Sequence, residues 1–176
     1  MLLALALFLV IPGLRGKSIQ SVAFSPSGEQ VAFTYVYNHE DSEMLSLHLL
    51  NLQTQEDREI FYSTFPSWDM TSDIQWLGER YLFFLRHCGS SCQGLSLLDT
   101  QTREVKNATL TYQSYPTLPA STFFKDWSGR EFQMEGFPKK IQSRSNGDIN
   151  SIIFSLEDKA GREVGKRKIE FLSSFP

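Results

Sequence analysis

The stretch SIQSVAFSPSGEQVAF, residues 18–33, decides the fold. It consists of an apolar segment, the turn sequence Ser-Pro-Ser-Gly and a second apolar segment. Pro26 fixes its own φ angle at a turn position and has no N–H to lose from a strand ladder, while Gly28 can adopt a positive φ without a Cβ clash. After the turn, larger apolar side chains alternate along residues 31–37 with the period of two that is typical of a strand. The stretch therefore predicts a β-hairpin.

The turn glycine of this hairpin recurs along the chain. Gly28 has a counterpart at Gly78, 50 positions later, and a weaker one at Gly129, a further 51 positions on. Fixed spacing of this size is typical of repeat architectures, in which each unit buries its apolar faces against its neighbours. We therefore interpret the hairpin as part of a repeating unit.

A second element repeats at a similar spacing. HLLNLQTQEDREI at 48–60 is echoed by SLLDTQTREV at 96–105 and by SLEDKAGREV at 155–164. Agreement at two separate landmarks predicts an all-β fold of about three four-stranded antiparallel units within one domain, residues 17–176. The units are expected at residues 18–63, 71–112 and 118–172.

The repeat resembles the WD40-like (PD40) repeat of TolB-type β-propellers. Residues 23–28, Ala-Phe-Ser-Pro-Ser-Gly, match its turn signature with Ser27 in place of the usual Asp, and residues 49–54 and 97–102 match its second element. The resemblance implies propeller-type blades, yet three blades are fewer than the about four to eight that close a propeller. An incomplete or open propeller, a chain shortened from a longer relative and a homodimer that completes the ring are the alternatives.

Charge is distributed unevenly along the chain of 176 residues, whose formal net charge is −3. Residues 17–110 contain 6 Lys and Arg against 12 Asp and Glu, and residues 111–176 contain 10 against 8. These values, −6 and +2, are too modest for a nucleic-acid footprint. We expect a protein or peptide partner and no nucleic acid.

The N-terminus predicts export. Residues 2–11 are apolar and are followed by Pro12 and Gly13, then by Arg15 and Lys17. The run is shorter than the about 20 residues of a membrane-spanning helix and has the length of a signal-peptide core. We expect a signal peptide at 1–16, no transmembrane span and a periplasmic or secreted protein. A buried strand, or the tail of a hydrophobic segment that begins earlier, is the alternative.

The two cysteines predict a structural disulfide. Cys88 and Cys92 flank Gly-Ser-Ser between two apolar segments, at what we expect to be a hairpin tip. A disulfide fits an oxidising compartment. A thioredoxin-like redox pair would have two intervening residues, and half of a zinc site would need two further ligands, in a chain with only three His.

Catalytic and cofactor motifs are absent from the sequence. There is no P-loop, Rossmann fingerprint, H-E-x-x-H or G-x-S-x-G, the nearest match to the last being GSSCQG at 89–94. Two acidic clusters lack EF-hand spacing and are interpreted as solvated loops, and the three tryptophans as core residues. These side chains are His39, Glu40, Asp41, Glu43, Asp69, Asp73, Trp68, Trp76 and Trp127. We expect no metal and no cofactor.

Two functions fit these observations. The first is a non-enzymatic extracytoplasmic binding or scaffolding module of the TolB-like type. The alternative is the propeller portion of a prolyl-oligopeptidase-type peptidase whose catalytic domain is on another chain, because the same repeat occurs in such enzymes. The repeat itself does not choose between them, because one fold serves many functions.

Overall fold

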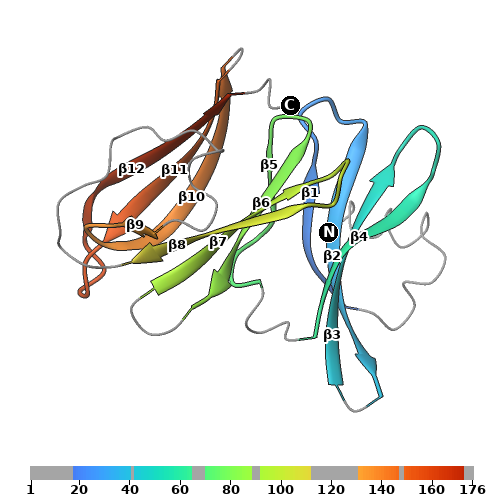
Figure 1. The fold of residues 1–176 in the computed structure, drawn as a ribbon, viewed down its shortest axis with the longest axis horizontal. Coiled ribbons are helices and arrows are strands. Elements are labelled where there is room, and N and C mark those ends of the chain that lie inside the picture. The colour runs from blue at the N-terminus through green and yellow to red at the C-terminus, as the bar shows by residue number, and fades with distance from the viewer. Residues whose placement is uncertain are drawn as a thin grey trace.

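The computed structural model describes residues 18–40, 42–64, 70–88, 92–111, 131–146 and 149–172. These ranges contain twelve β-strands, which Figure 1 shows gathered into three groups along the molecule. The strands are β1 (Ser18–Phe24), β2 (Gln30–His39), β3 (Ser42–Asn51), β4 (Asp57–Ser63), β5 (Gln75–Leu77), β6 (Tyr81–His87), β7 (Cys92–Asp99), β8 (Val105–Thr111), β9 (Glu131–Gln133), β10 (Phe137–Asn146), β11 (Ile149–Glu157) and β12 (Glu163–Leu172). The prediction of an all-β fold is confirmed.

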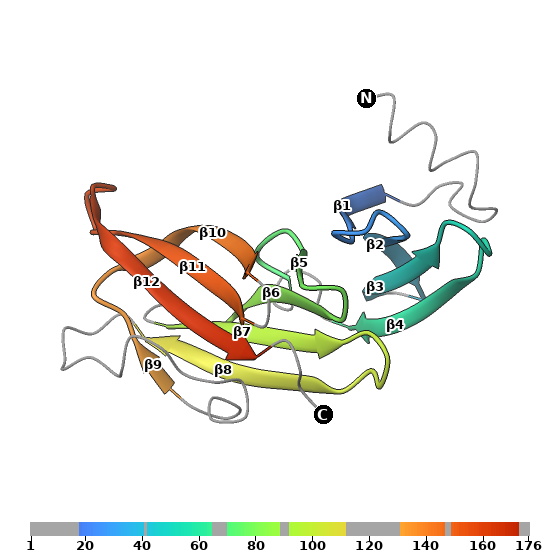
Figure 2. The same ribbon diagram turned by 90° about the horizontal axis from the view of Figure 1, so that it is seen from above.

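The strands form three sheets, visible from two directions in Figures 1 and 2. The N-terminal sheet has the order β1-β2-β3-β4, the central sheet β5-β6-β7-β8-β9 and the C-terminal sheet β10-β11-β12. Strands that follow one another in the chain lie side by side, and every pair is antiparallel except β8 and β9. This is the up-and-down meander of a propeller-type blade, arranged as an open stack.

The hairpin turns have the backbone geometry that glycine favours. Gly28 has a φ of 75°, and its N–H donates to the carbonyl of Ser25 at 2.9 Å. Gly78, between β5 and β6, has a φ of 63°. Both values lie in the left-handed region, where a Cβ clashes with the backbone. Gly129 lies outside the described residues.

A side chain caps each of the turns that precede β4, β8 and β12. Asn51, Asp99 and Asp158 each accept hydrogen bonds from two backbone N–H groups that follow them, at 2.8–3.2 Å. Such Asx turns position a tight reversal of the chain. In the first two turns the chain then passes through a positive φ, 60° at Gln55 and 64° at Arg103. The second sequence landmark therefore corresponds to a repeated turn.

Strand β9 joins a different sheet from the one that its sequence position suggests. The third unit was expected to begin near residue 118 with four strands of its own, but β9 pairs in parallel with β8, placing Phe132 beside Leu110. Phe132 and Met134 are both buried between the central and C-terminal sheets. Burial of these two side chains accounts for the placement, and it leaves the C-terminal sheet with three strands among the described residues.

The core lies in two layers, one on each face of the central sheet. Phe83, Leu95 and Phe154 belong to the layer shared with the C-terminal sheet, and Phe84 and Leu47 to the layer shared with the N-terminal sheet. Because side chains alternate between the two faces of a strand, the run YLFFL in β6 fills both layers at once. The central sheet is thus covered on both faces.

The remaining expectations concern the chain ends and the cysteines. Cys88 and Cys92 lie at disulfide distance with Cα atoms 5.3 Å apart, a separation typical of a disulfide. The proposed signal peptide, residues 1–16, lies outside the described residues. Within the described ranges, no helix has the length and apolar character needed to cross a membrane.

Candidate functional site

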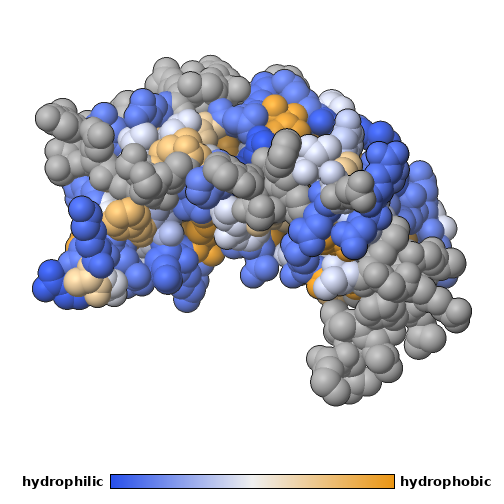
Figure 3. All heavy atoms as spheres, turned by 90° about the horizontal axis from the view of Figure 1, so that it is seen from below, coloured by the Kyte–Doolittle hydropathy of each residue, from blue (hydrophilic) through white to orange (hydrophobic). Residues whose placement is uncertain are grey.

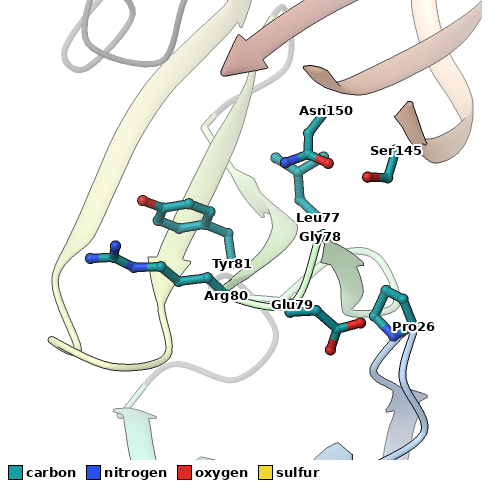
Figure 4. A pocket seen from close by; sticks show the side chains of 8 residues that line it. All are labelled: Pro26, Leu77, Gly78, Glu79, Arg80, Tyr81, Ser145 and Asn150. Atoms are coloured by element: carbon teal, nitrogen blue, oxygen red, sulfur yellow. The ribbon is translucent and has the colours of Figure 1, made fainter. Parts of the chain in front are cut away.

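A pocket lies where the three sheets meet at one end of their inner strands (Figure 4). Its volume is about 300 Å³. The N-terminal sheet contributes one turn residue, the central sheet its whole β5–β6 turn, and the C-terminal sheet two residues near the β10–β11 turn. The lining residues are Pro26, Leu77, Gly78, Glu79, Arg80, Tyr81, Ser145 and Asn150. Because Pro26 and Gly78 are residues of the repeated hairpin, stacking of the units builds the pocket from their turns.

Hydrogen bonds between the inner strands bring these turns together. The indole Nε1–H of Trp76 in β5 donates to the carbonyl of Ala23 in β1 at 3.0 Å, and the N–H of Ile74 donates to the hydroxyl of Ser21 at 3.1 Å. On the other side, the amide of Gln75 donates to the carbonyl of Ile141 in β10 at 3.1 Å. Strand β5 therefore holds both neighbouring sheets by their inner strands. Trp76 is buried, as the sequence predicted.

Glu79 links the turns of the N-terminal and central sheets. Its Oε1 accepts from the backbone N–H of Ser27 at 2.7 Å, and its Oε2 accepts from the Ser27 hydroxyl at 2.9 Å. Ser27 is the position where the resembled repeat usually has Asp. An aspartate there would place a second carboxylate against Glu79 and remove the hydroxyl donor, and like charges at this distance repel. Serine rather than aspartate at position 27 is therefore consistent with the hydrogen bonds that this residue donates to Glu79.

Gly78 allows the C-terminal sheet to approach the turn. A Cβ atom at this position would lie 3.1 Å from Nδ2 of Asn150, closer than an ordinary van der Waals contact. The positive φ of Gly78 is a second, independent reason for a glycine. Asn150 is buried and forms the wall of the pocket opposite Glu79 (Figure 4).

An ion pair links the β5–β6 turn to the end of β7. Nε and Nη2 of Arg80 donate to Oδ2 of Asp99 at 2.9 and 2.6 Å, and the guanidinium lies over the ring of Tyr81, 5.4 Å from its centroid. Burial opposes the charge on Asp99, but hydrogen bonds from Arg80 and from the N–H groups of Gln101 and Thr102 outweigh it and lower the pKa of this carboxyl. The hydrogen bond to Asp99 raises the pKa of Arg80, and burial raises that of Tyr81.

The lining residues give the pocket several hydrogen-bond acceptors next to apolar surface. The carboxylate of Glu79 lies at the exposed rim, and the hydroxyl of Ser145 and the amide of Asn150 lie across from it (Figure 4). Leu77 and Tyr81 also line the pocket, with side chains that are only 1% and 6% exposed, and the exposed ring of Pro26 supplies apolar surface at the rim. Such a site accepts a ligand group with an apolar stem and a hydrogen-bond donor at its end.

A separate hydrogen-bonded row lies on the outer face of the N-terminal sheet. Nε2 of His48 is 2.9 Å from the hydroxyl of Ser46, and Nδ1 is 2.9 Å from Asp57. This order of nucleophile, base and orienting carboxylate is found in hydrolases. Here, however, Ser46 is fully buried and its hydroxyl donates to Glu59, so its proton is not directed at the imidazole. The ring of His48 stacks on Phe33, and the hydrogen-bonded row joins β3 to β4.

The sequence identified the turns but not the roles of the polar and charged residues around the pocket. Arg80 and Asn150 belong to no recognisable motif. Glu79 follows the turn glycine Gly78 as Glu29 follows Gly28, and the one signal for its contact was Ser27 in place of the usual Asp. Cys88 and Cys92 lie at the far end of β6 and β7 from the pocket.

The predicted acidic clusters lie away from the pocket. His39, Glu40 and Glu43 are exposed at the β2–β3 turn. Among the residues that the structure describes, no group of three or more His, Cys, Asp and Glu side chains could hold a metal ion. Asp41 and Asp69, with Trp68 and Trp127, lie outside those residues.

Comparison with solved structures finds similar folds, and we describe two of them. TolB from Acinetobacter baumannii is 12% identical, with a TM-score of 0.46 over 90% of this chain and 30% of that one. The β-propeller domain of the Trilobed protease from Pyrococcus furiosus, described as having an open velcro topology, is 13% identical, with a TM-score of 0.43 over 77% of this chain and 34% of that one. The chain thus spans about a third of the length of either. Neither a protein-family model nor a curated protein matches the sequence.

Proposed function

We propose that the protein is a non-enzymatic, extracytoplasmic binding or scaffolding module that holds a protein or peptide segment in the pocket among the repeat turns. The observation that supports this most strongly is the joint lining of one pocket by all three sheets. Binding sites occur preferentially where structural units meet. A ligand here would contact every unit of the stack.

The chemistry of the lining favours a basic side chain of that segment. A volume of about 300 Å³ is at the small end for ligand sites and suits one long side chain rather than a cofactor. The aliphatic stem of Lys or Arg would lie along the exposed ring of Pro26, and its charged end would reach Glu79. Hydrogen bonds between charged partners are about twice as strong as neutral ones.

Selection of a random peptide library on the purified protein tests this proposal. We expect enriched peptides to share Lys or Arg and to bind at least about tenfold more weakly to Glu79→Gln, the loss that one charge-assisted hydrogen bond supports. Glu43→Gln, an exposed carboxylate at the β2–β3 turn, is the matched control and should bind as the wild type does. Absence of any enriched peptide, or binding indifferent to Glu79→Gln, would overturn the proposal.

The non-enzymatic part is tested separately. Because the Ser46 hydroxyl is buried and donates to Glu59, we expect no turnover in an unbiased screen of ester and peptide substrates. Robust turnover, abolished by Ser46→Ala, would contradict this. Stoichiometric copurification with a hydrolase from the source organism would instead assign the alternative role, the propeller portion of a two-chain peptidase.

Export is tested by mass. The apolar segment 2–11 and the disulfide distance between Cys88 and Cys92 support an oxidising compartment outside the cytoplasm. Intact-mass measurement of the protein from its source should show loss of about the first 16 residues and of two hydrogens. A reduced chain that retains its N-terminus in the cytoplasm would contradict this part of the proposal.

A further inference from the structure

A second pocket lies between the N-terminal and central sheets, near the start of β1, whereas the repeat turns follow the ends of the inner strands. Its volume is about 360 Å³. Strands β1 and β2 form one side of it, and the segment that leads into β5 forms the other. The described lining residues are Gln20, Ser21, Thr34, Met70, Thr71, Ser72 and Asp73. None of them lines the pocket among the repeat turns.

This pocket is distinguished by polar groups that have no partner within the described chain. Hydrophilic side chains cover much of the described surface, as Figure 3 shows from one side, so polarity alone does not mark a site. The amide of Gln20 and the carboxylate of Asp73 are both exposed. Neither side chain forms a hydrogen bond or an ion pair with a described residue. Both groups are therefore free to bind a ligand at the mouth of the pocket.

Gln20 occupies a bulge in β1. Ile19 of β1 pairs with Tyr35 of β2. Ser21, two residues on, pairs with Thr34, which is only one residue from Tyr35, so Gln20 is the extra residue of the ladder. Such bulges re-aim side chains and are frequent next to active sites. Here the bulge brings Ser21 opposite Thr34, and both line the pocket.

Thr34 carries a buried hydroxyl without a hydrogen-bond partner. The residue pairs with Leu47 on the inner face of the sheet, is 0% exposed, and its Oγ1 forms no hydrogen bond. An unpaired buried hydroxyl costs stability, and valine would have nearly the same shape without that cost. Ser21 beside it accepts from the N–H of Ile74 at 3.1 Å, which leaves its own O–H proton to donate. A ligand would supply the missing partners.

The opposite side of the pocket is held in place by the central sheet. The N–H of Thr71 donates to the carbonyl of Leu85 at 2.8 Å, and the hydroxyl of Ser72 accepts from the N–H of Leu85 at 2.9 Å. Oγ1 of Thr71 also accepts from the amide of Gln93 at 2.8 Å, which leaves its O–H proton available. These groups are positioned before a ligand arrives, which lowers the entropic cost of binding.

The lining residues select the chemical class of the ligand. Four hydroxyls and one amide can both donate and accept hydrogen bonds, and one carboxylate accepts them. The described lining holds no Lys, Arg or His for an anion, and a single carboxylate is too few for a calcium site. The volume is about tenfold that of a water molecule and lies in the range of ligand sites. A compact ligand whose own hydroxyls donate and accept fits these groups.

We propose that this pocket binds one neutral sugar ring. Gln20 and Asp73 would bind hydroxyls of the ring at the mouth, and Thr71 would donate to another. The unbranched side chain of Met70, half-buried in the lining, would contact the C–H groups of the ring, and its adaptability allows the small shift that opens access to Thr34. This proposal does not depend on the pocket among the repeat turns or on its peptide ligand.

NMR titration of the isotope-labelled full chain tests the proposal. The probes are D-glucose, D-galactose, D-mannose and N-acetyl-D-glucosamine, each as the free sugar and as its methyl glycoside, which stands for the end of a glycan. We expect at least one probe to shift the backbone signals of residues 20–21, 34 and 70–73 saturably. Gln20→Ala and Asp73→Asn should each weaken this binding at least about tenfold. Gln53→Ala, an exposed amide of the β3–β4 turn, is the control and should bind as the wild type does.

A pair of threonine variants separates ligand binding from a purely structural role. Thr111, at the end of β8, also has a buried hydroxyl without a hydrogen-bond partner but does not line this pocket. Thr34→Val and Thr111→Val should both raise Tm, because each removes an unpaired buried hydroxyl. Only Thr34→Val should weaken sugar binding. Equal binding by these two variants would show that the Thr34 hydroxyl does not meet the ligand and would contradict the proposed site.

The proposal is overturned if none of the sugar probes shifts these signals saturably. Shifts that appear only with ethanolamine or calcium chloride would overturn it too, because they would assign the site to an amine or a cation. Sugar binding indifferent to both Gln20→Ala and Asp73→Asn would place the ligand elsewhere and contradict it equally. Each of these results would leave the peptide selection on the pocket among the repeat turns untouched.

Discussion

The central and C-terminal sheets are built from the same meander but differ in how many of their faces are buried. In β6, the consecutive residues Phe83 and Phe84 are both buried, one in each core layer. In β11, Phe154 is buried while Ile153 lies on the outer face beside Lys168. Burial on both faces therefore makes β6 a continuous apolar run, whereas burial on one face makes β11 an alternation of apolar and polar residues.

Truncation of core side chains should give the largest effects. We expect Phe83→Ala and Phe84→Ala each to lower the free energy of unfolding by about 3–5 kcal/mol, since each leaves a cavity in a buried layer. In the C-terminal sheet Ile152→Ala should cost about 2–5 kcal/mol, whereas Ile153→Ala on the outer face should cost less than about 1 kcal/mol. Urea unfolding measures all four. Equal losses at positions 152 and 153 would refute the one-sided burial of the C-terminal sheet.

The two aspartates that cap turns, Asp99 in the central sheet and Asp158 in the C-terminal sheet, allow the same comparison for charged groups. Asp99→Asn in the central sheet keeps an acceptor for the turn but loses the ion pair with Arg80, and should cost about 1–3 kcal/mol. Asp158→Asn, at the equivalent turn of the C-terminal sheet, loses the pair with Arg162 in a solvent-exposed setting and should cost less. Chemical denaturation at neutral pH compares them, and a larger loss at Asp158 would contradict the ranking.

The ion pair between Asp99 and Arg80 predicts that the free energy of unfolding depends on pH. Because the folded state lowers the pKa of Asp99, its stabilisation is present above the unfolded pKa of about 3.9 and is lost as pH falls through the lower, folded pKa. The difference in stability between wild type and Asp99→Asn should therefore shrink on acidification. A difference that stays constant from neutral to strongly acidic pH would show that Asp99 acts only through packing.

Two glycines with positive φ provide a smaller contrast. Gly78 and Gly161 have φ values of 63° and 77°, so alanine at either should cost about 1–2 kcal/mol in backbone strain. At Gly161 the new Cβ meets open space, but at Gly78 it meets Asn150. Thermal unfolding should therefore rank Gly78→Ala as the more damaging. The reverse order would mean that Asn150 moves aside without cost.

The sequence predicted the hairpins of the first two units, their turns at Gly28 and Gly78, and the stacking of successive units because these depend on local patterns. Pro26 and Gly28 specify a turn wherever the chain places it, and the alternation after the turn specifies the buried face. The pocket could not be predicted in the same way. Glu79 meets Ser27 across 52 positions of sequence, and that meeting depends on how one sheet stacks on the next.

The pairing of β9 with β8 was unpredictable for a related reason. Three residues carry little β signal of their own, and residues 131–133 resemble the opening of the third repeat unit. Their placement depends on the burial of Phe132 and Met134 in a layer that exists only after the central and C-terminal sheets have come together. Long-range burial therefore decided what the local pattern left open.

The position of strand β9 affects how the protein unfolds. It belongs to the hydrogen-bond ladder of the central sheet, yet β10 follows it closely through Gly136, where a Cβ would lie 2.8 Å from the carbonyl oxygen of Glu157. Detaching the C-terminal sheet would expose Phe132 and Met134 and strain that connection. Stacked repeats can unfold one unit at a time. We therefore expect β9 to couple the last two sheets, so that they unfold as one cooperative unit.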